Sequence, residues 1–228
     1  MRDGEKNTLL FDYGQFHSFG LAIAVFVFFK SIKWNKIFSE SIQNIISRIA
    51  DSMKSTFNSA KFRENPIEFI KTRIKQPDSI ATKLKKKGYP ITVESVRQHL
   101  NDVAGVRVIC AFIDDIYKVA DMLSAQDDVV LIKTKDYIKK PKMNGYRSLH
   151  LIVEVPVFFS DHKENMRVEV QIRTIAMDFW ASLEHQVKYK KDIKDAENIV
   201  YELRACADVI NRTDFHMQAI RDNIVEID

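Results

Sequence analysis

The segment MRVEVQIRT at residues 166–174 alternates between apolar and polar side chains. In an extended chain, this alternation places the apolar side chains on one side and the polar ones on the other. The apolar side carries Val168, Val170 and Ile172, and the polar side carries Arg167, Glu169, Gln171 and Arg173. The pattern predicts a β-strand with one packed face and one polar face. Taken alone, it fits best an edge strand without a chemical role.

Three segments upstream of this one predict further strands of the same sheet. They are GVRVICAFI (105–113), VVLIKTKDYI (129–138) and SLHLIVEVPVFF (148–159), which are rich in apolar and β-branched residues. Helices are expected around them at 66–74 starting with Pro66, at 77–88 between Pro77 and Gly88, at 92–100, at 114–126 with an aspartate cap, at 175–190 and at 199–224. Strands flanked by helices predict an α/β sheet core.

The N-terminal region is predicted to be helical. Residues 36–60 repeat apolar positions at helical spacing, and FGLAIAVFVFF at 19–29 is an apolar run. That run is shorter than the ~20 residues that cross a bilayer. We expect a buried helix there, with an interfacial or partner-binding helix and a targeting segment as alternatives.

The composition of the whole chain, 46% hydrophobic and 29% charged, is globular. The two cysteines, Cys110 and Cys206, are far apart in the sequence and favour a cytoplasmic protein with reduced thiols. We expect no membrane association.

Two carboxylates are candidates for a metal site. Asp102 lies just before the predicted strand at 105–113, and Glu169 lies on the polar side of the strand at 166–174. Carboxylates from neighbouring strands can share one hard cation. Mg²⁺ takes one or two carboxylates and fills its shell with water and phosphate oxygens. The two residues therefore predict a site for Mg²⁺ and a polyphosphate.

Cationic side chains gather in two segments that suit a phosphorylated ligand. RIKQPDSIATKLKKKG at 73–88 places several cations close to Ser79, near a helix start where backbone N–H groups favour phosphate. KKPKMNGYRSLH at 139–150 surrounds an Asn-Gly turn with cations and adds Tyr146 and His150, which suits a stacked base. A solvated lysine face and a basic hairpin turn are the alternatives. The sequence has no G-x-x-x-x-G-K-[ST] or G-x-G-x-x-G motif, so a bound ATP would not use either phosphate loop.

Four ordered motifs and a following helix resemble the synthetase domain of the RelA/SpoT family, in particular its stand-alone small alarmone synthetases. They are R-I-K-x-P-x-S-x-x-x-K at 73–83, D-V-A-G-V-R at 102–107, N-G-Y-R-S-L-H at 144–150, E-V-Q-I-R-T at 169–174 and F-W-A-S-L-E-H at 179–185. The resemblance implies an α/β (α+β) fold, a nucleotidyltransferase-like mixed β-sheet flanked by helices. It also implies transfer of the β,γ-pyrophosphate of ATP to the 3′-oxygen of GDP or GTP, which gives ppGpp or pppGpp and AMP.

The resemblance implies a role for each matching residue. Asp102 and Glu169 would bind Mg²⁺, and Glu169 would also take the proton from the 3′-hydroxyl. The ATP-binding residues would be Arg73, Lys75, Ser79, Lys83, Lys86 and Arg107, with the two arginines on either side of the adenine. The GDP/GTP-binding residues would be Lys142, Asn144, Tyr146, His150, Gln171 and Asp178, with Tyr146 stacked on guanine. Asp178 stands where some members of the family carry asparagine.

We expect an N-terminal helical extension at 1–60, a synthetase domain at 61–190 and a C-terminal helical segment at 191–228. The last segment resembles the helices through which small synthetases form homotetramers. We expect synthesis without hydrolysis, because no His-Asp dipeptide of a hydrolase half is present. Regulation by RNA or by an alarmone, and the preference for GDP or GTP, stay open. Two other functions also stay open: transfer of pyrophosphate to the 3′ end of tRNA, with which the net charge of +4 is compatible, and a non-catalytic module that binds nucleotides or RNA.

Overall fold

The computed structural model describes residues 65–158, 163–188 and 196–225, together with positions 44, 47 and 51. Its elements are β1 (Ile67–Ile74), α3 (Pro77–Lys86), α4 (Val93–His99), β2 (Ala104–Cys110), α5 (Ile113–Ser124), β3 (Val130–Asp136), β4 (Leu149–Phe158), β5 (Lys163–Thr174), α6 (Ile175–Lys188) and α7 (Ala196–Val225). Apart from those three positions, the extension expected at 1–60 lies outside the described residues, and so does the apolar run at 19–29. No helix in the described ranges is both long and apolar enough to cross a membrane.

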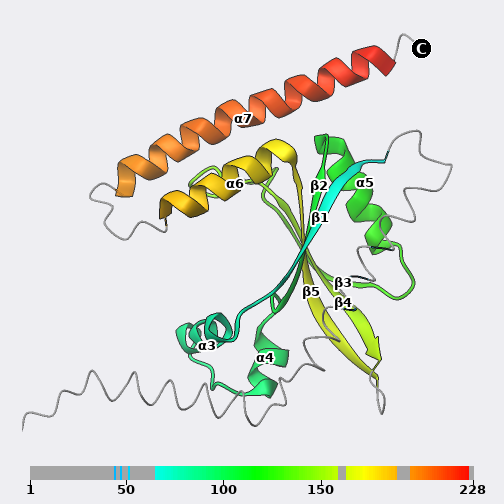
Figure 1. Ribbon diagram of the computed structural model, residues 1–228, viewed down its shortest axis with the longest axis vertical. Helices are drawn as coiled ribbons and strands as arrows, with labels where there is room; N and C mark the ends of the chain where they lie inside the picture. The colour runs from blue at the N-terminus through cyan, green and yellow to red at the C-terminus, as the bar shows by residue number, and fades with distance from the viewer. Residues whose placement is uncertain are drawn as a thin grey trace, which may run out of the picture.

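The five strands form one mixed sheet in the order β1-β2-β5-β4-β3 (Figure 1). β2 and β5 pair in parallel, and the other neighbours pair antiparallel. A mixed sheet with helices confirms the predicted fold class. β5 lies between β2 and β4 and pairs with both, so the edge-strand interpretation of residues 166–174 is wrong.

The two faces of the sheet differ in chemistry. On one face, alternate residues of β2 and β5 such as Val108 and Val170 are fully buried, and they share one core with Leu84 of α3 and Ile116 of α5. Burial of one such side chain contributes about 1.5–3 kcal/mol. The opposite face carries the polar residues of the same strands. In Figure 1, α6 and α7 lie side by side at one end of the sheet, and α3 and α4 lie at the other.

The predicted helix at 66–74 is wrong, because these residues form strand β1. The prediction rested on Pro66 at the start of the segment, and the spacing of Ile67, Ile70 and Ile74 is also compatible with a helical face. The pairing of β1 with β2 shifts register between Ile67 and Phe69, and this irregularity adds one residue to β1. The shift brings Ile67 onto the same side of the sheet as Ile70 and Ile74, and all three pack against the core. Pro66 precedes the strand, where its missing N–H is tolerated.

The predicted helix ends are partly correct. Gly88 has a φ of +76° directly after α3, and the backbone N–H of Tyr89 donates to the Leu84 carbonyl at 3.0 Å, which confirms the predicted stop at Gly88. The aspartate cap of α5 is wrong: Phe112 occupies the N-cap position without a side-chain hydrogen bond. Asp114 and Asp115 lie in the first helical turn instead, where their charges suit the positive end of the helix dipole.

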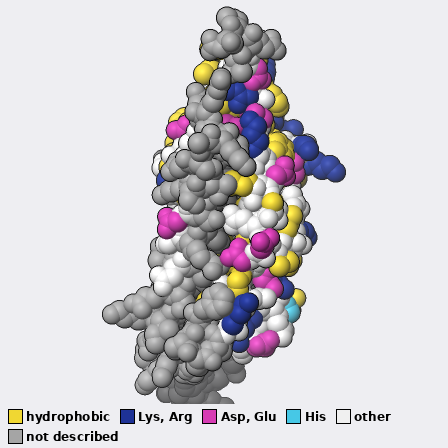
Figure 2. Space-filling model, turned by 90° about the vertical axis from the view of Figure 1, so that its right-hand side faces the viewer, with side chains coloured by type: hydrophobic (Ala, Val, Ile, Leu, Met, Phe, Trp, Pro, Cys, Tyr) yellow, Lys and Arg dark blue, Asp and Glu magenta, His cyan; other side chains and the backbone are white. Residues whose placement is uncertain are grey.

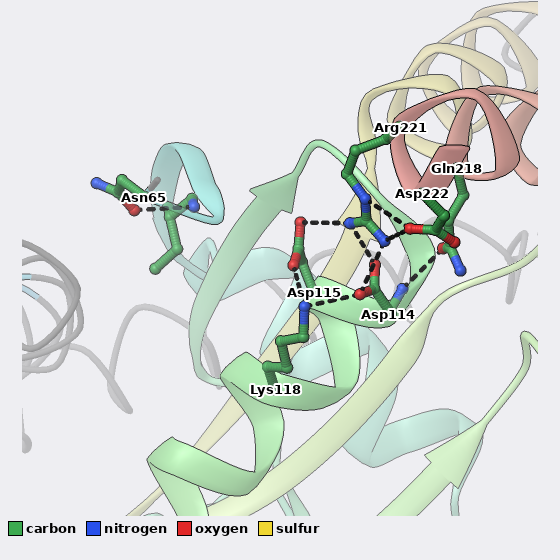
Figure 3. Close-up of polar contacts among 8 residues, drawn as sticks. Asn65, Asp114, Asp115, Lys118, Gln218, Arg221 and Asp222 are labelled. Atoms are coloured by element: carbon green, nitrogen blue, oxygen red, sulfur yellow. Dashed lines mark hydrogen bonds and ion pairs between the residues drawn. The ribbon is translucent and has the colours of Figure 1, made fainter. Parts of the chain in front are cut away.

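The C-terminal half of α7 is fixed to the start of α5. Arg221 donates to both carboxylate oxygens of Asp114, at 2.9 and 3.1 Å, and Gln218 Oε1 accepts from the Asp114 backbone N–H at 3.1 Å (Figure 3). Lys118 donates to the same carboxylate at 2.7 Å. These contacts fix the C-terminal half of α7, and the N-terminal half of α7 packs on the loop between β3 and β4.

Candidate functional site

A cleft opens on the polar face of the sheet, where β1, β2 and β5 lie next to one another. Its volume is about 330 Å³. The lining residues are Lys71, Thr72, Arg73, Lys75, Asp102, Gly105, Val106, Arg107, Glu169 and Gln171. Glu169 and Gln171 alternate with the buried valines of β5, so the strand geometry alone directs both side chains to this face.

Asp102 and Glu169 lie in this cleft on adjacent parts of the fold. Glu169 pairs with Gly105 in the parallel register of β2 and β5, and Asp102 lies two residues before the start of β2. Lys75 Nζ and Lys83 Nζ both donate to Asp102 Oδ2, at 2.7 and 2.6 Å. Burial works to raise the pKa of Asp102, but the two lysines outweigh it and hold that pKa below its ordinary value. Asp102 is therefore an ionised carboxylate at neutral pH.

The second oxygen of Asp102 fits a bound cation. Oδ1 is buried, and no hydrogen-bond partner reaches it within the described part of the protein. A buried carboxylate oxygen without a partner is costly, and a divalent ion would satisfy it. Over the ranges that the structure describes, no three His, Cys, Asp or Glu residues could hold a metal together. The site therefore suits Mg²⁺ shared between two carboxylates and the phosphate oxygens of a ligand, and does not suit a closed protein cage.

Glu169 belongs to a closed ring of five hydrogen-bonded side chains. His150 Nδ1 lies 3.4 Å from Glu169 Oε1, and Gln171 Nε2 donates to Glu169 Oε2 at 2.9 Å. The Tyr146 hydroxyl lies 2.8 Å from His150 Nε2. Arg173 Nη2 closes the ring by donating to the Tyr146 hydroxyl at 2.6 Å and to Gln171 Oε1 at 2.7 Å. Each side chain therefore restricts the orientation of its neighbours.

The ring favours an ionised Glu169 and a neutral His150. Burial works to raise the pKa of Glu169, but the hydrogen bonds from His150 and Gln171 prevail, and the pKa lies below its ordinary value. Burial lowers the pKa of His150, and its contact with Glu169 compensates only in part. Burial also raises the pKa of the Tyr146 hydroxyl. The ring therefore offers a carboxylate that can accept a proton and a tyrosine that keeps its own.

Residues 72–194 match the region found in RelA / SpoT proteins. The chain belongs to the RelA/SpoT family. GTP pyrophosphokinase YwaC of Bacillus subtilis strain 168 is 47% identical over 160 residues, which are 70% of this chain and 76% of the relative. GTP pyrophosphokinase YjbM of the same strain is 38% identical over 162 residues, 71% of this chain and 75% of the relative.

Solved structures of RelA/SpoT relatives share the fold. Small alarmone synthetase 1 from Bacillus subtilis, bound to its product pppGpp, has a TM-score of 0.75 and 32% identity, and the match covers 84% of this chain and 98% of the other. Small alarmone synthetase 2 from the same organism has a TM-score of 0.69 and 41% identity, over 81% of this chain and 97% of the other. The likeness therefore extends over nearly the whole length of both relatives.

Most of the residues predicted for the donor side of a RelA/SpoT site come together. Arg73, Lys75 and Arg107 line the cleft, and Lys83 reaches it through its bond to Asp102. Arg73 pairs with Gly105, so it lies on the strand next to that of Arg107. Two predicted residues lie on α3 outside the lining: Ser79 is exposed in the first turn and Lys86 is exposed at the end.

Four of the six predicted acceptor residues lie in or beside the loop between β3 and β4, whereas Gln171 lies on β5 and Asp178 on α6. Tyr146 and His150 reach Glu169 through the ring, and Lys142 Nζ lies 4.4 Å from the centre of the Tyr146 ring. Asn144 has structural contacts: its Nδ2 donates to Glu184 Oε1 at 3.0 Å, and its Oδ1 accepts from the backbone of Tyr146 at 3.3 Å. Asn144 therefore shapes the turn that presents Tyr146.

Asp178 is buried in the first turn of α6 and contacts cations from both sides of the site. Its Oδ1 accepts from Arg107 Nη1 at 3.1 Å and from Arg173 Nη1 at 3.2 Å. Lys71 Nζ lies 3.7 Å from its Oδ2. Three cations thus share one carboxylate, which leaves an excess of positive charge beside the cleft and favours polyphosphate ligands.

Sequence reasoning missed four residues of the site. Lys71 and Thr72 line the cleft but lie in the segment that was predicted as a helix. Tyr137 lies with its ring 4.8 Å from Lys142 Nζ, at the end of β3 where no motif points to it. Arg173 was placed correctly on the polar side of β5, in line with Glu169 and Gln171, and that alternation was the available signal for its role.

Proposed function

We propose that the cleft is the active site of a GTP pyrophosphokinase, which transfers the β,γ-pyrophosphate of ATP to the ribose 3′-hydroxyl of GDP or GTP and makes the alarmones ppGpp and pppGpp. The observation that carries the proposal is the convergence of Asp102 and Glu169 in one cleft lined by cations. Membership of the RelA/SpoT family and the 47% identity to a GTP pyrophosphokinase support it. The enzyme is a transferase that consumes ATP.

Asp102 and Glu169 would hold Mg²⁺ in this reaction. Asp102 Oδ1, which is buried and finds no hydrogen-bond partner in the described part of the chain, supports this assignment. When bound, the ion supplies positive charge to the oxygens of the transferring phosphates. Lys75 and Lys83 add two fixed cations beside Asp102, and they bind the same phosphates, with Ser79 and Lys86 assisting from α3.

The chemistry needs little more than alignment and charge neutralisation. The 3′-oxygen attacks the β-phosphorus of ATP and forms a bond to it. The bond between that phosphorus and the oxygen bridging to the α-phosphate breaks, and AMP leaves with the electron pair. Glu169 accepts the proton of the 3′-hydroxyl, which requires the ionised form that the ring favours.

Arginine and tyrosine side chains orient the two bases. Arg73 and Arg107, on neighbouring strands, would stack on the two faces of the adenine. Tyr146 would stack on the guanine. The remaining acceptor contacts would come from Lys142, Asn144, His150, Gln171 and Asp178.

The chain is proposed to assemble as a homotetramer through residues 191–228. Large apolar side chains of α7, and of the neighbouring helix α6, are exposed, and exposed apolar side chains that gather on a surface can mark interaction sites. They are Ile175, Phe179, Leu183, Val187, Tyr201, Val209, Phe215, Met217, Ile220 and Ile224. Light scattering should give four times the 26.5 kDa of one chain. Phe215→Asp should lower that mass, whereas Val130→Asp on the exposed strand β3 should not; an unchanged mass for Phe215→Asp would contradict an interface at α7.

A transfer assay with ATP labelled on the γ-phosphate tests the function. GDP, GTP and deacylated tRNA are offered separately, and label is expected in GDP and GTP. Label in tRNA alone would establish the tRNA-modifying alternative, and ATP binding without transfer to any acceptor would establish the non-catalytic one. On the part of the face in Figure 2 that is not drawn in grey, acidic, basic and apolar side chains are interspersed, and this part gives no support to an extended RNA-binding surface.

A further inference from the structure

Arg173 is a buried cation at the end of β5, with 3% of its surface exposed. Its guanidinium donates to Ser148 Oγ at 3.3 Å, to Asp178 Oδ1 at 3.2 Å, to the Tyr146 hydroxyl at 2.6 Å and to Gln171 Oε1 at 2.7 Å. Burying a charge is costly, and apolar side chains often stabilise such positions equally well or better. The stability of the fold therefore does not by itself explain why an arginine occupies this position.

Arg173 sets the direction of the hydrogen bonds that end on Glu169. Arginine only donates. The Tyr146 hydroxyl oxygen therefore accepts from Arg173, and because the Glu169 carboxylate at the other end also only accepts, the hydroxyl hydrogen is left for His150 Nε2. The imidazole hydrogen then resides on Nδ1, which faces Glu169 Oε1 at 3.4 Å.

The second path, through Gln171, follows the same logic. Gln171 Oε1 accepts from Arg173, so the amide nitrogen of Gln171 must face Glu169 Oε2, where it donates at 2.9 Å. One buried cation thus orders both paths and fixes which way the Gln171 amide and the Tyr146 hydroxyl point.

Arg173 also reaches the donor side of the site. Asp178 Oδ1 accepts from Arg173 and from Arg107, at 3.2 and 3.1 Å. The Nε atom of Arg107 is buried and has no partner among the described residues, so Asp178 is the anchor that the structure shows for this guanidinium. An undisturbed Arg173–Asp178 pair therefore supports the orientation of Arg107.

We propose that Arg173 is a positioning residue for the transfer reaction, which orients Tyr146 and Gln171 on the acceptor side and, through Asp178, Arg107 on the donor side. The inference rests on the proposed function, since it assigns Arg173 to the two substrate sites of that reaction. A purely structural role would lower stability without changing the affinity for either nucleotide.

Steady-state kinetics of Arg173→Lys, beside a thermal melt, separates these roles. Lysine keeps the charge but cannot reach four partners in the arginine geometry. We expect a folded variant whose KM for GDP rises about tenfold or more, with a smaller rise in the KM for ATP. Arg97→Lys is the matched control, because Arg97 pairs with Glu164 away from the cleft and its loss should leave both KM values unchanged. Both KM values of Arg173→Lys within twofold of the parent chain would overturn the inference, whatever the melting temperature.

A double-variant cycle tests the acceptor path directly. If Arg173 acts through the Tyr146 hydroxyl, Tyr146→Phe should raise the KM for GDP less in the Arg173→Lys background than alone. If the fold-changes that the two substitutions cause in the KM for GDP simply multiply in the double variant, the path through the Tyr146 hydroxyl is overturned. A parent chain that transfers nothing to GDP or GTP would defeat the proposed function itself, whereas normal transfer with an unaffected Arg173→Lys variant would defeat only the present inference.

Discussion

Gly145→Ala should destabilise the fold by about 2–5 kcal/mol, and Gly88→Ala by only about 1–2 kcal/mol. Both glycines have a positive φ, +86° and +76°, so both substitutions incur the left-handed backbone cost. They differ in their surroundings. A Cβ on Gly145 would lie 2.5 Å from the Cβ of Ala207 and 3.3 Å from the Cα of Arg204, whereas a Cβ on Gly88 would meet nothing within 4 Å.

The difference between the two variants isolates the close approach of the acceptor loop to α7. Overpacking of this kind costs about 1–3 kcal/mol. Arg147 strengthens the approach, since its guanidinium donates to the Ala207 carbonyl at 3.1 Å and to Asp208 at 3.0 Å. Because Tyr146 follows Gly145 directly, Gly145→Ala should also raise the KM for GDP more than the KM for ATP.

Urea unfolding at one fixed protein concentration measures the stability effect, since an assembly makes apparent stability depend on concentration. Combining Gly145→Ala with Ala207→Gly removes the contact between the two Cβ atoms. The double variant should therefore recover the stability lost to that contact, less the ~1 kcal/mol that a glycine in a helix costs. Equal destabilisation by Gly145→Ala and Gly88→Ala would refute the packing of the loop against α7.

Two more outcomes test the cation site and the attachment of α7. Chelation of divalent ions with EDTA should abolish transfer and added Mg²⁺ should restore it, because the phosphates must be neutralised; transfer that persists in EDTA would contradict the cation site. Burial works to raise the pKa of Asp114, but Arg221 and Lys118 hold that pKa below its ordinary value of 3.8. The ion pairs therefore stabilise the fold above pH 3.8, and this stabilisation is lost as the pH falls through the pKa that Asp114 has in the folded protein. The destabilisation caused by Asp114→Asn in urea unfolding should thus be larger at pH 7 than at pH 3, and equal values would show that the pairs contribute nothing.

Strong local patterns made most of the fold predictable. β2 and β4 are rich in β-branched residues, β5 alternates apolar and polar side chains, and α3 begins with a proline and is followed by Gly88. β1 was not predictable in the same way, because its register shift hides the alternation and gives its isoleucines helix-like spacing. Such an irregularity is decided by pairing with β2, which lies 30 or more residues away in the chain.

The site was predictable where motif and strand geometry agree. Arg73, Lys75, Asp102, Glu169 and Gln171 converge as expected, because two of them alternate on β5 and the others lie on or beside the neighbouring strands.

The remaining site contacts depend on tertiary structure. Arg173 looks like any polar residue of an alternating strand, and its burial comes from the loop at Tyr146 and from α6. Asp178, which was predicted for the guanine side, also accepts hydrogen bonds from Arg107, 71 residues away in the chain, and from Arg173, 5 residues away. No local pattern specifies such a shared carboxylate.

Glu169→Gln tests the central claim most directly, since it keeps the shape of the side chain and removes its ability to accept a proton. The measurement is the rate of label transfer at saturating ATP and GDP, beside ATP binding by calorimetry with Mg²⁺ present. The account predicts a rate at least about a hundredfold lower while ATP still binds. Turnover at the parent rate would contradict the assignment of Glu169 as the base and of this cleft as the place of transfer.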